Sequence, residues 1–430
     1  MVVAKLKGID YVNISVFGFG LAAVSTSLGQ IVLPMRILDV APEELKNTYL
    51  GILTFLGMAI AMVVQPAVGF LSDRTTLPWG RRRPYMALGT LAATGLMVTI
   101  GIASSYFWLV VTAVVVQMFA NVAQNPYDAM VKDRVPPDQR GRVSSLRAIS
   151  GAAGAITFVL MTGIFMDRHS PNQRDLWLWM SLLLPASLMT ATMVWTMFAV
   201  KEKGYSPVPG REKVTIALGG DGTHPQLKRI LAAGFFFSLA VGILQTYTLF
   251  FLRDVVEVKN PASALGILAI AVGLPLLVTL YPAGLLSDRL GRRPLLIFSA
   301  VLGSIGSVLF SLAQDLTQVV LIGILLGMSV GIFMSAGRAL IVDLVSEHRA
   351  ALQLGVANIA LMSGLAMAKL AGVAIDALNK LSGNLGYYSM LGVSAVGFLI
   401  GALLISALKY NHIAAVAPGP EATITAELGD

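Results

Sequence analysis

Twelve long apolar stretches dominate the chain, and short polar segments separate them. They lie at about 12–36, 48–71, 85–103, 107–131, 143–165, 176–200, 229–252, 263–286, 295–313, 317–341, 351–374 and 386–408. A helix needs about 20 consecutive apolar residues to cross a bilayer, and each stretch is close to that length or longer. The pattern therefore predicts an all-α membrane protein with twelve transmembrane helices.

One polar segment divides the twelve stretches into two sets of six. Residues 201–226 hold Gly, Pro and mixed charge without an apolar run, as is typical of a linker. From Tyr410 onwards the chain is rich in Ala, Pro, Gly and acidic residues, too polar to insert. We expect two six-helix bundles, at 1–200 and 227–408, joined by a cytoplasmic linker at 201–226 and followed by a disordered cytoplasmic tail at 409–430.

A charged hairpin is repeated in the two halves. The segment GFLSDRTTLPWGRRRP (Gly69–Pro84) lies between the second and third stretches, and GLLSDRLGRRP (Gly284–Pro294) lies between the eighth and ninth. Charged residues in equivalent loops are hard to attribute to chance similarity of apolar sequence. The repeat indicates two parallel, pseudo-symmetric halves, an arrangement in which a midplane site lies between the bundles and access alternates by rocking.

Composition supports a membrane protein and limits the chemistry. Of 430 residues, 56% are hydrophobic and 13% are charged, whereas an ordinary soluble protein is about a quarter charged. The chain has no cysteine, which excludes disulfides and thiolate metal sites. The net charge of +8 comes largely from basic residues in the polar segments, so we attribute it to membrane topology and expect no nucleic-acid partner.

The distribution of Lys and Arg predicts the orientation. With both termini inside, most of the 31 basic residues fall on the cytoplasmic side, as the positive-inside rule requires. The first stretch is too long for the core of a signal peptide, and we expect it to be retained as a helix. We therefore expect an integral protein of the plasma (cytoplasmic) membrane, surrounded by lipid and monomeric.

At the level of motifs, the chain resembles the major facilitator superfamily. The pattern G-x-x-x-D-R-x-x-G-R-R stands in the first hairpin, with an echo in the second. Gln65–Pro84 and Asn121–Asp133 are similar to segments of sucrose/proton symporters. Phe17–Gly20 and Pro126–Arg147 resemble the glycoside–pentoside–hexuronide:cation symporters. The resemblance implies the twelve-helix facilitator fold and the transport of a sugar or glycoside, with Arg147 kept from the latter group.

Some residues depart from this pattern. Melibiose-type relatives carry acids in spans 1, 2 and 4, where this chain aligns Ser25, Ala61, Gln65 and Gln124. A sodium site of that type is therefore not expected, and we expect neither a metal nor another cofactor. Proton coupling and uniport both remain open.

The fourth stretch carries a stripe of polar residues. Gln117, Asn121, Gln124 and Asp128 are spaced four, three and four residues apart, which places them on one face of a helix. Such a face avoids lipid because an unpaired polar group there costs several kcal/mol. It either lines a cavity or hydrogen-bonds to another helix, and we favour the cavity.

Asp128 has two alternative roles. Acids inside a membrane are usually functional, which makes Asp128 the best candidate for a proton carrier. Its counterpart in the second half is Arg338, and an ion pair between the two would instead close the cytoplasmic side. The sequence does not decide between proton transfer and this gate.

Further polar residues are candidates for substrate binding. Amides and an adjacent ring suit hydroxyl-rich ligands. The complete set of substrate candidates is Gln30, Gln117, Asn121, Gln124, Arg147, Gln245, Tyr247 and Asn358. Lys369 shares a helical face with Asn358 and either snorkels to the outer interface or provides a fixed positive charge to the cavity.

The repeated hairpins are predicted to form a gate at the cytoplasmic side. Their arginines can pair with carboxylates at span ends, and Asp133 and Asp343 are the expected partners. The gate candidates are Asp73, Arg74, Arg81, Arg82, Arg83, Asp133, Asp288, Arg289, Arg292, Arg338 and Asp343.

The sequence is compatible with four functions, which it does not favour equally. No nucleotide loop, metal cluster or nucleophile constellation is visible, and we do not expect an enzyme. The favoured function is secondary transport of a sugar or glycoside. A proton-driven drug exporter is disfavoured because Ser150–Leu160 in span 5 lacks the Gly-Pro pair of such exporters. A uniporter and a non-transporting membrane assembly factor of the pigment-assembly type complete the set.

Overall fold

The computed structural model describes residues 7–170, 176–200, 225–345 and 350–408. All regular structure in these residues is helical. The elements are α1 (Gly8–Ser27), η1 (Leu28–Val32), α2 (Leu33–Val40), η2 (Glu43–Leu45), α3 (Lys46–Arg74), α4 (Arg83–Ile102), α5 (Tyr106–Arg134), η3 (Pro137–Gln139), α6 (Arg140–Met166), α7 (Leu176–Ala199), α8 (Pro225–Asp254), α9 (Pro261–Leu290), α10 (Arg292–Ser311), α11 (Leu316–Leu344), α12 (Ala350–Lys369), α13 (Ala371–Leu381) and α14 (Leu385–Ser406).

The predicted twelve spans are confirmed. Twelve helical segments in the described part of the chain are long and apolar enough to cross a membrane. Many are longer than the apolar stretches, because charged ends continue the helix, as at Arg74 in α3 and Arg134 in α5. The predicted linker and tail lie outside the described residues, except for Pro225 and Gln226, which begin α8.

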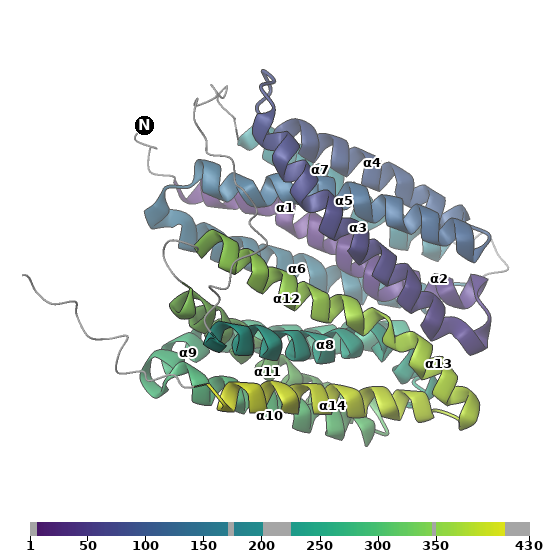
Figure 1. Ribbon diagram of the computed structural model, residues 1–430. Helices are drawn as coiled ribbons and strands as arrows, with labels where there is room; N and C mark the ends of the chain where they lie inside the picture. Colours follow the sequence, from purple (N-terminus) through teal and green to yellow (C-terminus); the bar gives the residue numbers. More distant parts are fainter. Residues whose placement is uncertain (1–6, 171–175, 201–224, 346–349, 409–430) are drawn as a thin grey trace, which may run out of the picture.

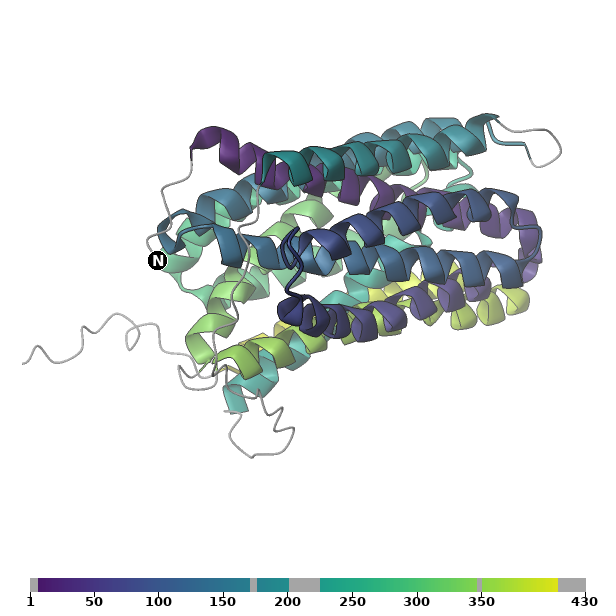
Figure 2. The ribbon, with the colours of Figure 1, turned by 90° about the horizontal axis from the view of Figure 1, so that it is seen from above.

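The helices pack as two groups along the sequence. In Figure 1 the purple-to-blue helices α1 to α7 lie together, and the teal-to-yellow helices α8 to α14 lie below them. Within the first group α1 packs on α6 and α7, and within the second α8 packs on α12 and α14. The two groups meet where α6 packs on α9 and where α3 packs on α12 and α13. Figure 2 shows the same bundle turned by a right angle.

Both charged hairpins turn at a glycine. Gly80 and Gly291 have φ angles of 101° and 92°, a left-handed region that glycine enters without steric cost. Gly291 directly precedes α10, and Gly80 is separated from α4 by Arg81 and Arg82. We call this end of the bundle the hairpin end, and the opposite end, which carries η2 and the end of α13, the closed end.

Two spans are irregular. The first changes from α-helix to a π-helical segment, η1, at Leu28–Val32. The eleventh, predicted as one stretch at 351–374, is broken at Leu370 into α12 and α13 and continues to Leu381. Irregular backbone at membrane depth is tolerated where it is buried in protein or lines a cavity, so both breaks indicate a functional region.

Candidate functional site

A cavity of about 830 Å³ lies between the two groups of helices. Its wall comes from α1, η1, α2, α3 and α5 on one side and from α8 and α12 on the other. Six of the eight predicted substrate residues line it: Gln30, Gln117, Asn121, Gln124, Gln245 and Asn358. The structure thus brings together amides that are far apart in the sequence.

Four of these amides are free to bind a ligand. The side chains of Gln30, Gln117, Gln245 and Asn358 form no hydrogen bond with a residue that the structure describes, although all four line the cavity. Gln30 lies on the π-helical segment η1, a geometry often found at functional sites. An amide supplies both donors and acceptors, so these side chains together can bind several hydroxyl groups.

The polar stripe of α5 both lines the cavity and hydrogen-bonds to another helix, the two roles considered from the sequence. Asn121 lines the cavity wall but is 2% exposed. Its Oδ1 accepts a hydrogen bond of 2.8 Å from Gln65 Nε2 of α3, and its Nδ2 donates to the Gln117 carbonyl at 2.8 Å. Asn121 therefore joins α3 to α5, while Gln117 and Gln124 are less covered and present their amides to the cavity.

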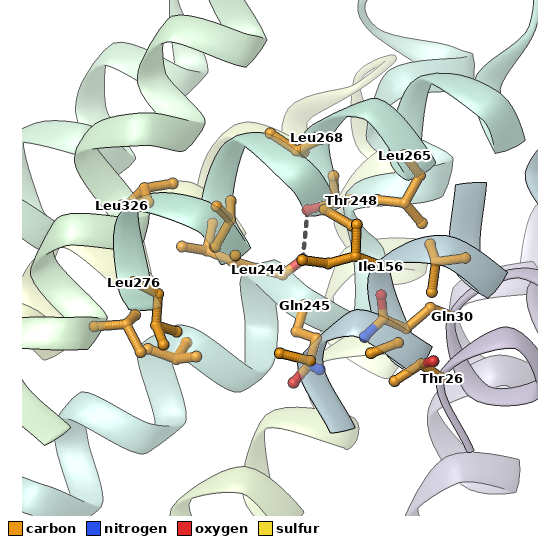
Figure 3. Close-up of a pocket in the computed structure, with 18 of the residues that line it drawn as sticks. Thr26, Gln30, Ile156, Leu244, Gln245, Thr248, Leu265, Leu268, Leu276 and Leu326 are labelled. Carbon is orange, nitrogen blue, oxygen red and sulfur yellow. Dashed lines mark hydrogen bonds between the residues drawn. The ribbon is translucent and has the colours of Figure 1, made fainter. Parts of the chain in front are cut away.

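A second, apolar compartment adjoins the first. It has a volume of about 430 Å³ and shares Thr26, Gln30 and Gln245 with the polar cavity. Figure 3 shows its wall, in which the leucines of α8, α9 and α11 surround the space next to Gln30 and Gln245. The combined space offers hydrogen bonds at one side and an apolar surface at the other.

Asp128 and Arg147 pair with each other rather than lining the cavity. Arg147 Nη2 lies 2.5 Å from Asp128 Oδ1, and the guanidinium carbon lies 3.9 Å from the centre of the Tyr127 ring. Asp128 retains 55% side-chain exposure. The alternative partner, Arg338, is exposed on α11 and forms no ion pair with a described residue. An Asp128–Arg338 closing pair is therefore absent from this conformation.

Tyr247 is placed at the helix break rather than in the cavity. Its side chain is fully buried, and its hydroxyl donates to the Lys369 carbonyl at 2.5 Å and accepts from the Gly372 N–H at 2.8 Å. Val373 N–H bonds to the Leu370 carbonyl, three residues back. The Tyr247 hydroxyl thus replaces a bond of the regular helix, and our expectation of substrate contact from Tyr247 has no support in this geometry.

Lys369 lines the polar cavity at the end of α12. Its Nζ donates a hydrogen bond of 2.7 Å to Thr246 Oγ1 of α8. The sequence left two positions open for the Lys369 amine, the outer interface and the cavity, and in the structure the amine faces the cavity. Among the described residues that line this cavity, Lys369 is the one that carries a formal charge.

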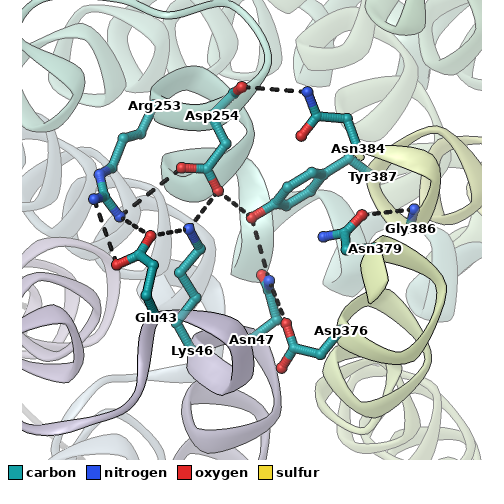
Figure 4. Close-up of polar contacts among 10 residues, drawn as sticks. All are labelled: Glu43, Lys46, Asn47, Arg253, Asp254, Asp376, Asn379, Asn384, Gly386 and Tyr387. Atoms are coloured by element: carbon teal, nitrogen blue, oxygen red, sulfur yellow. Dashed lines mark hydrogen bonds and ion pairs between the residues drawn. The ribbon is translucent and has the colours of Figure 1, made fainter. Parts of the chain in front are cut away.

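A polar network joins the two groups of helices at the closed end (Figure 4). Asp254 of α8 lies 2.6 Å from Lys46 Nζ of α3 and accepts a hydrogen bond of 2.5 Å from the Tyr387 hydroxyl. Arg253 pairs with Glu43 at 2.9 Å. None of these five residues was predicted from the sequence to join the two groups.

Asp376 and Asp167 each anchor the opposite group. Asp376 is 3% exposed and accepts hydrogen bonds from Asn47 Nδ2 at 2.8 Å and the Thr48 N–H at 2.6 Å. Asp167, after α6, accepts the N–H groups of Ala262 and Ser263 at 2.9 and 2.8 Å. A carboxylate at a helix N-terminus satisfies free N–H groups and interacts favourably with the helix dipole.

Comparison with known proteins decides the family. A family model described as MFS/sugar transport protein matches residues 16–378. The chain belongs to this family.

Relatives and solved structures agree with this assignment. An uncharacterized MFS-type transporter of Methanocaldococcus jannaschii is 24% identical over 353 residues, covering 80% of this chain and 83% of the relative. The multidrug resistance protein MdtG of Escherichia coli is 22% identical over 335 residues, covering 76% and 78%. The crystal structure of the nucleoside transporter NupG superposes with a TM-score of 0.68 at 16% identity, covering 93% of this chain and 99% of that one.

This MFS protein is accordingly an integral membrane protein of a transporter family and not an enzyme.

At the hairpin end, each ion pair joins two residues of the same group of helices, and the first group has several of them. Arg82 is 5% exposed and contacts Asp73 at 2.6 Å, Asp133 at 3.0 Å and Ser72 at 2.6 Å. Arg81 also lies 2.6 Å from Asp133. This arrangement fastens the hairpin to the end of α5.

The second group repeats part of this arrangement. Arg292 forms an ion pair with Asp343 at the end of α11, which matches Arg82 and Asp133 in the first group. Asp288 and Arg289 are exposed and form no ion pair with a described residue. The remaining candidates contact other groups, since Arg83 donates to carbonyls at the end of α7 and Arg74 stacks on Phe70. The second hairpin is thus the simpler of the two.

Proposed function

We propose that this MFS protein is a secondary transporter that carries a hydroxyl-rich small solute, a sugar or glycoside, by alternating access. The observation that carries the proposal is the set of four free amides, contributed by both groups of helices, around one central cavity. Because a site that hydrogen-bonds hydroxyl groups strongly rejects analogues lacking them, such a wall favours a polyhydroxylated ligand.

The apolar compartment narrows the proposal towards glycosides. It adjoins the amides at Gln30 and Gln245 and is walled mainly by leucine, isoleucine and valine. A glycoside with an apolar aglycone places its sugar against the amides and its aglycone against these leucines. Binding sites commonly combine a mostly apolar lining with a few placed polar groups.

The distribution of contacts between the groups supports alternating access. At the closed end, Asp376, Asp167 and Asp254 bind residues of the opposite group. At the hairpin end, the ion pairs of Arg82 and Arg292 stay within their own groups. We propose that the conformation described is open towards the hairpin end, that this end is cytoplasmic in the plasma membrane, and that the hairpins form its gate.

For coupling, we propose Asp128 as the proton carrier. It is the acidic member of the α5 stripe, lies beyond Gln124 on the same helical face and is partly exposed beside Arg147. A uniporter is the second candidate, because no acidic residue lines the described wall of the polar cavity. The protein is expected to act as a monomer.

The test is uptake by purified protein in proteoliposomes. A panel of labelled disaccharides and aryl glycosides is offered with and without a pH gradient, and saturable uptake of at least one sugar is expected. Asn358→Leu and Gln245→Leu should raise the half-saturating concentration about tenfold or more, because each leaves a solute hydroxyl unpaired. Lys380→Gln, on the exposed face of α13, serves as the control.

Two results would replace the proposal. Uptake or export of apolar cations without uptake of sugars would favour the drug-exporter alternative. The likeness to MdtG and the apolar compartment are the observations that favour this alternative. No solute flux at all, together with co-purification of a membrane protein or pigment, would favour the assembly factor.

A further inference from the structure

The polar cavity has an unbalanced positive charge. Its described wall holds amides, hydroxyls, apolar side chains and Lys369, but no carboxylate. A charge inside a membrane protein is costly unless it is paired, and such residues usually lie on a substrate or ion pathway. The cavity therefore lacks the negative partner that Lys369 requires.

The carboxylates of the eleventh span and of the α5 stripe are already occupied. Both oxygens of Asp376 accept hydrogen bonds from Asn47 and Thr48 at the closed end. Asp128 is paired with Arg147. No carboxylate of the described residues forms an ion pair with Lys369, whose Nζ is bonded to the neutral hydroxyl of Thr246.

The backbone position keeps the amine in the cavity. The Lys369 carbonyl accepts the Tyr247 hydroxyl, and Gly51 of α3 packs so closely on this carbonyl that an added Cβ would clash with it. Lys369 is thus held between the two groups of helices, and its side chain is partly buried. A lysine that snorkels to the interface extends its amine into water, whereas this amine turns to Thr246.

Free hydrogen-bonding groups line the same cavity as the amine. Gln245 is adjacent to Thr246 on α8, and Asn358 shares a face of α12 with Lys369, about 16 Å away at 1.5 Å per residue. Amide N–H groups can donate to an anion, and the wall holds no acid to repel one. An acidic group at Lys369 would still leave the other amides for hydroxyl groups along the cavity.

We propose that Lys369 binds an acidic group of the transported solute, so that the preferred substrate is a hydroxyl-rich organic anion bearing a carboxylate or a phosphate ester. This inference rests on the proposed transport of a sugar or glycoside and specifies its charge. Lys369 is then the specificity-determining residue: its ammonium forms the ion pair, Thr246 orients it, and the amides bind the neutral part of the solute.

The test uses matched ligands that differ only at one carbon. Methyl glucoside, methyl glucuronide and methyl glucoside 6-phosphate compete with a labelled sugar from the uptake panel for binding to the full-length protein. The two anions distinguish recognition of a carboxylate from recognition of a phosphate. At least one anion should compete at a concentration at least ten times lower than the neutral glucoside requires, so that the ratio of the two concentrations is ten or more. In Lys369→Gln that ratio should fall to about one, whereas Lys369→Arg should retain part of it and Lys380→Gln all of it.

The outcomes separate this inference from the proposed function. Equal competition by neutral and anionic ligands in the unmodified protein, or an unchanged ratio in Lys369→Gln, would overturn the role of Lys369 and leave sugar transport standing. Absence of competition by all three ligands and of sugar uptake would overturn both. Size-exclusion profiles and thermal melting establish that the variants are folded, and Lys369→Met provides a second neutral variant for the same ratio.

Discussion

The amide of Asn47 donates a 2.8 Å hydrogen bond to the carboxylate of Asp376, although the two residues belong to opposite groups of helices. Both side chains are almost fully buried. Asp376 receives a second bond from the Thr48 N–H, and the Asn47 amide also donates to the Tyr387 hydroxyl at 3.2 Å. Hydrogen bonds to an ionised acceptor are stronger than those between neutral groups, so this contact stabilises the packing of the two groups at the closed end.

Replacing Asp376 with Asn should open the closed end more often. A hydrogen bond to a charged group contributes about 1.5–3 kcal/mol, and losing about 1.4 kcal/mol shifts an equilibrium about tenfold. The chain has no cysteine, so a single cysteine at Leu50, which is 1% exposed, can report opening through its rate of maleimide labelling. We expect a several-fold faster rate in Asp376→Asn.

The control for this labelling is a cysteine at Leu381. Leu381 is 78% exposed at the end of α13, and its labelling rate should not depend on Asp376. An unchanged rate at position 50 would show that the Asn47–Asp376 bond does not hold the closed end.

Gly51→Ala should prevent full closure of the same end. A methyl group at Gly51 would meet the Lys369 carbonyl, which is backbone and cannot move aside as a flexible side chain would. Gly95→Ala in α4 is the matched control, since a Cβ there meets nothing within 4 Å. Both changes raise helix propensity by up to about 1 kcal/mol, so only a steric effect distinguishes them. Faster labelling at position 50 is expected in Gly51→Ala alone; equal rates would contradict the close contact.

Arg82→Lys should slow transport about tenfold or more while the protein still inserts. The guanidinium of Arg82 reaches Asp73, Asp133 and Ser72 at once, a geometry that a lysine ammonium cannot reproduce. Arg142→Lys is the control, because Arg142 is exposed on α6, lies outside the hairpins and forms no ion pair with a described residue. Initial uptake rates at equal protein in the membrane provide the measurement, and normal uptake by Arg82→Lys would remove the hairpin from the gating mechanism.

Asp128→Asn should abolish stimulation of uptake by a pH gradient. An amide does not titrate, so the proposed proton site is removed while the size of the side chain is kept. Arg147 would remain beside the amide and keep its contact with Tyr127. Uptake is compared with and without the gradient, and Asp138→Asn in η3 is the control. If stimulation persists in Asp128→Asn, the proton is carried elsewhere or the coupling is different.

The sequence was informative where charge and repetition coincide. Asp133 and Asp343 were expected to pair with arginines of the hairpins, and in the structure they pair with Arg82 and Arg292. The α5 stripe was visible because Gln117, Asn121 and Gln124 are polar residues at helical spacing within an apolar span. Each of these patterns depends on local periodicity or on a repeated motif, which a single sequence displays directly.

Other features depend on contacts that no local pattern contains. Asn47 and Asp376 lie at span ends, where polar residues are ordinary, and only the packing of α3 on α13 brings them together. Tyr247 was proposed as a substrate residue because a ring beside amides suits hydroxyl-rich ligands, but the break at Leu370 needs its hydroxyl as a bonding partner. Apolar residues continue through that break, so hydropathy alone predicts an unbroken helix.

The break at Leu370 gives the eleventh span two mechanical parts. The regular bonding pattern is interrupted there, and the eleven residues of α13 carry Asp376, while α12 carries Asn358 and Lys369. We therefore expect α13 to tilt as a short lever when the closed end opens, before α12 moves and while the solute stays in place. Backbone hydrogen exchange provides the measurement: faster exchange in α13 than in the adjacent turns of α12 is expected, and equal protection would indicate that the span moves as one rigid rod.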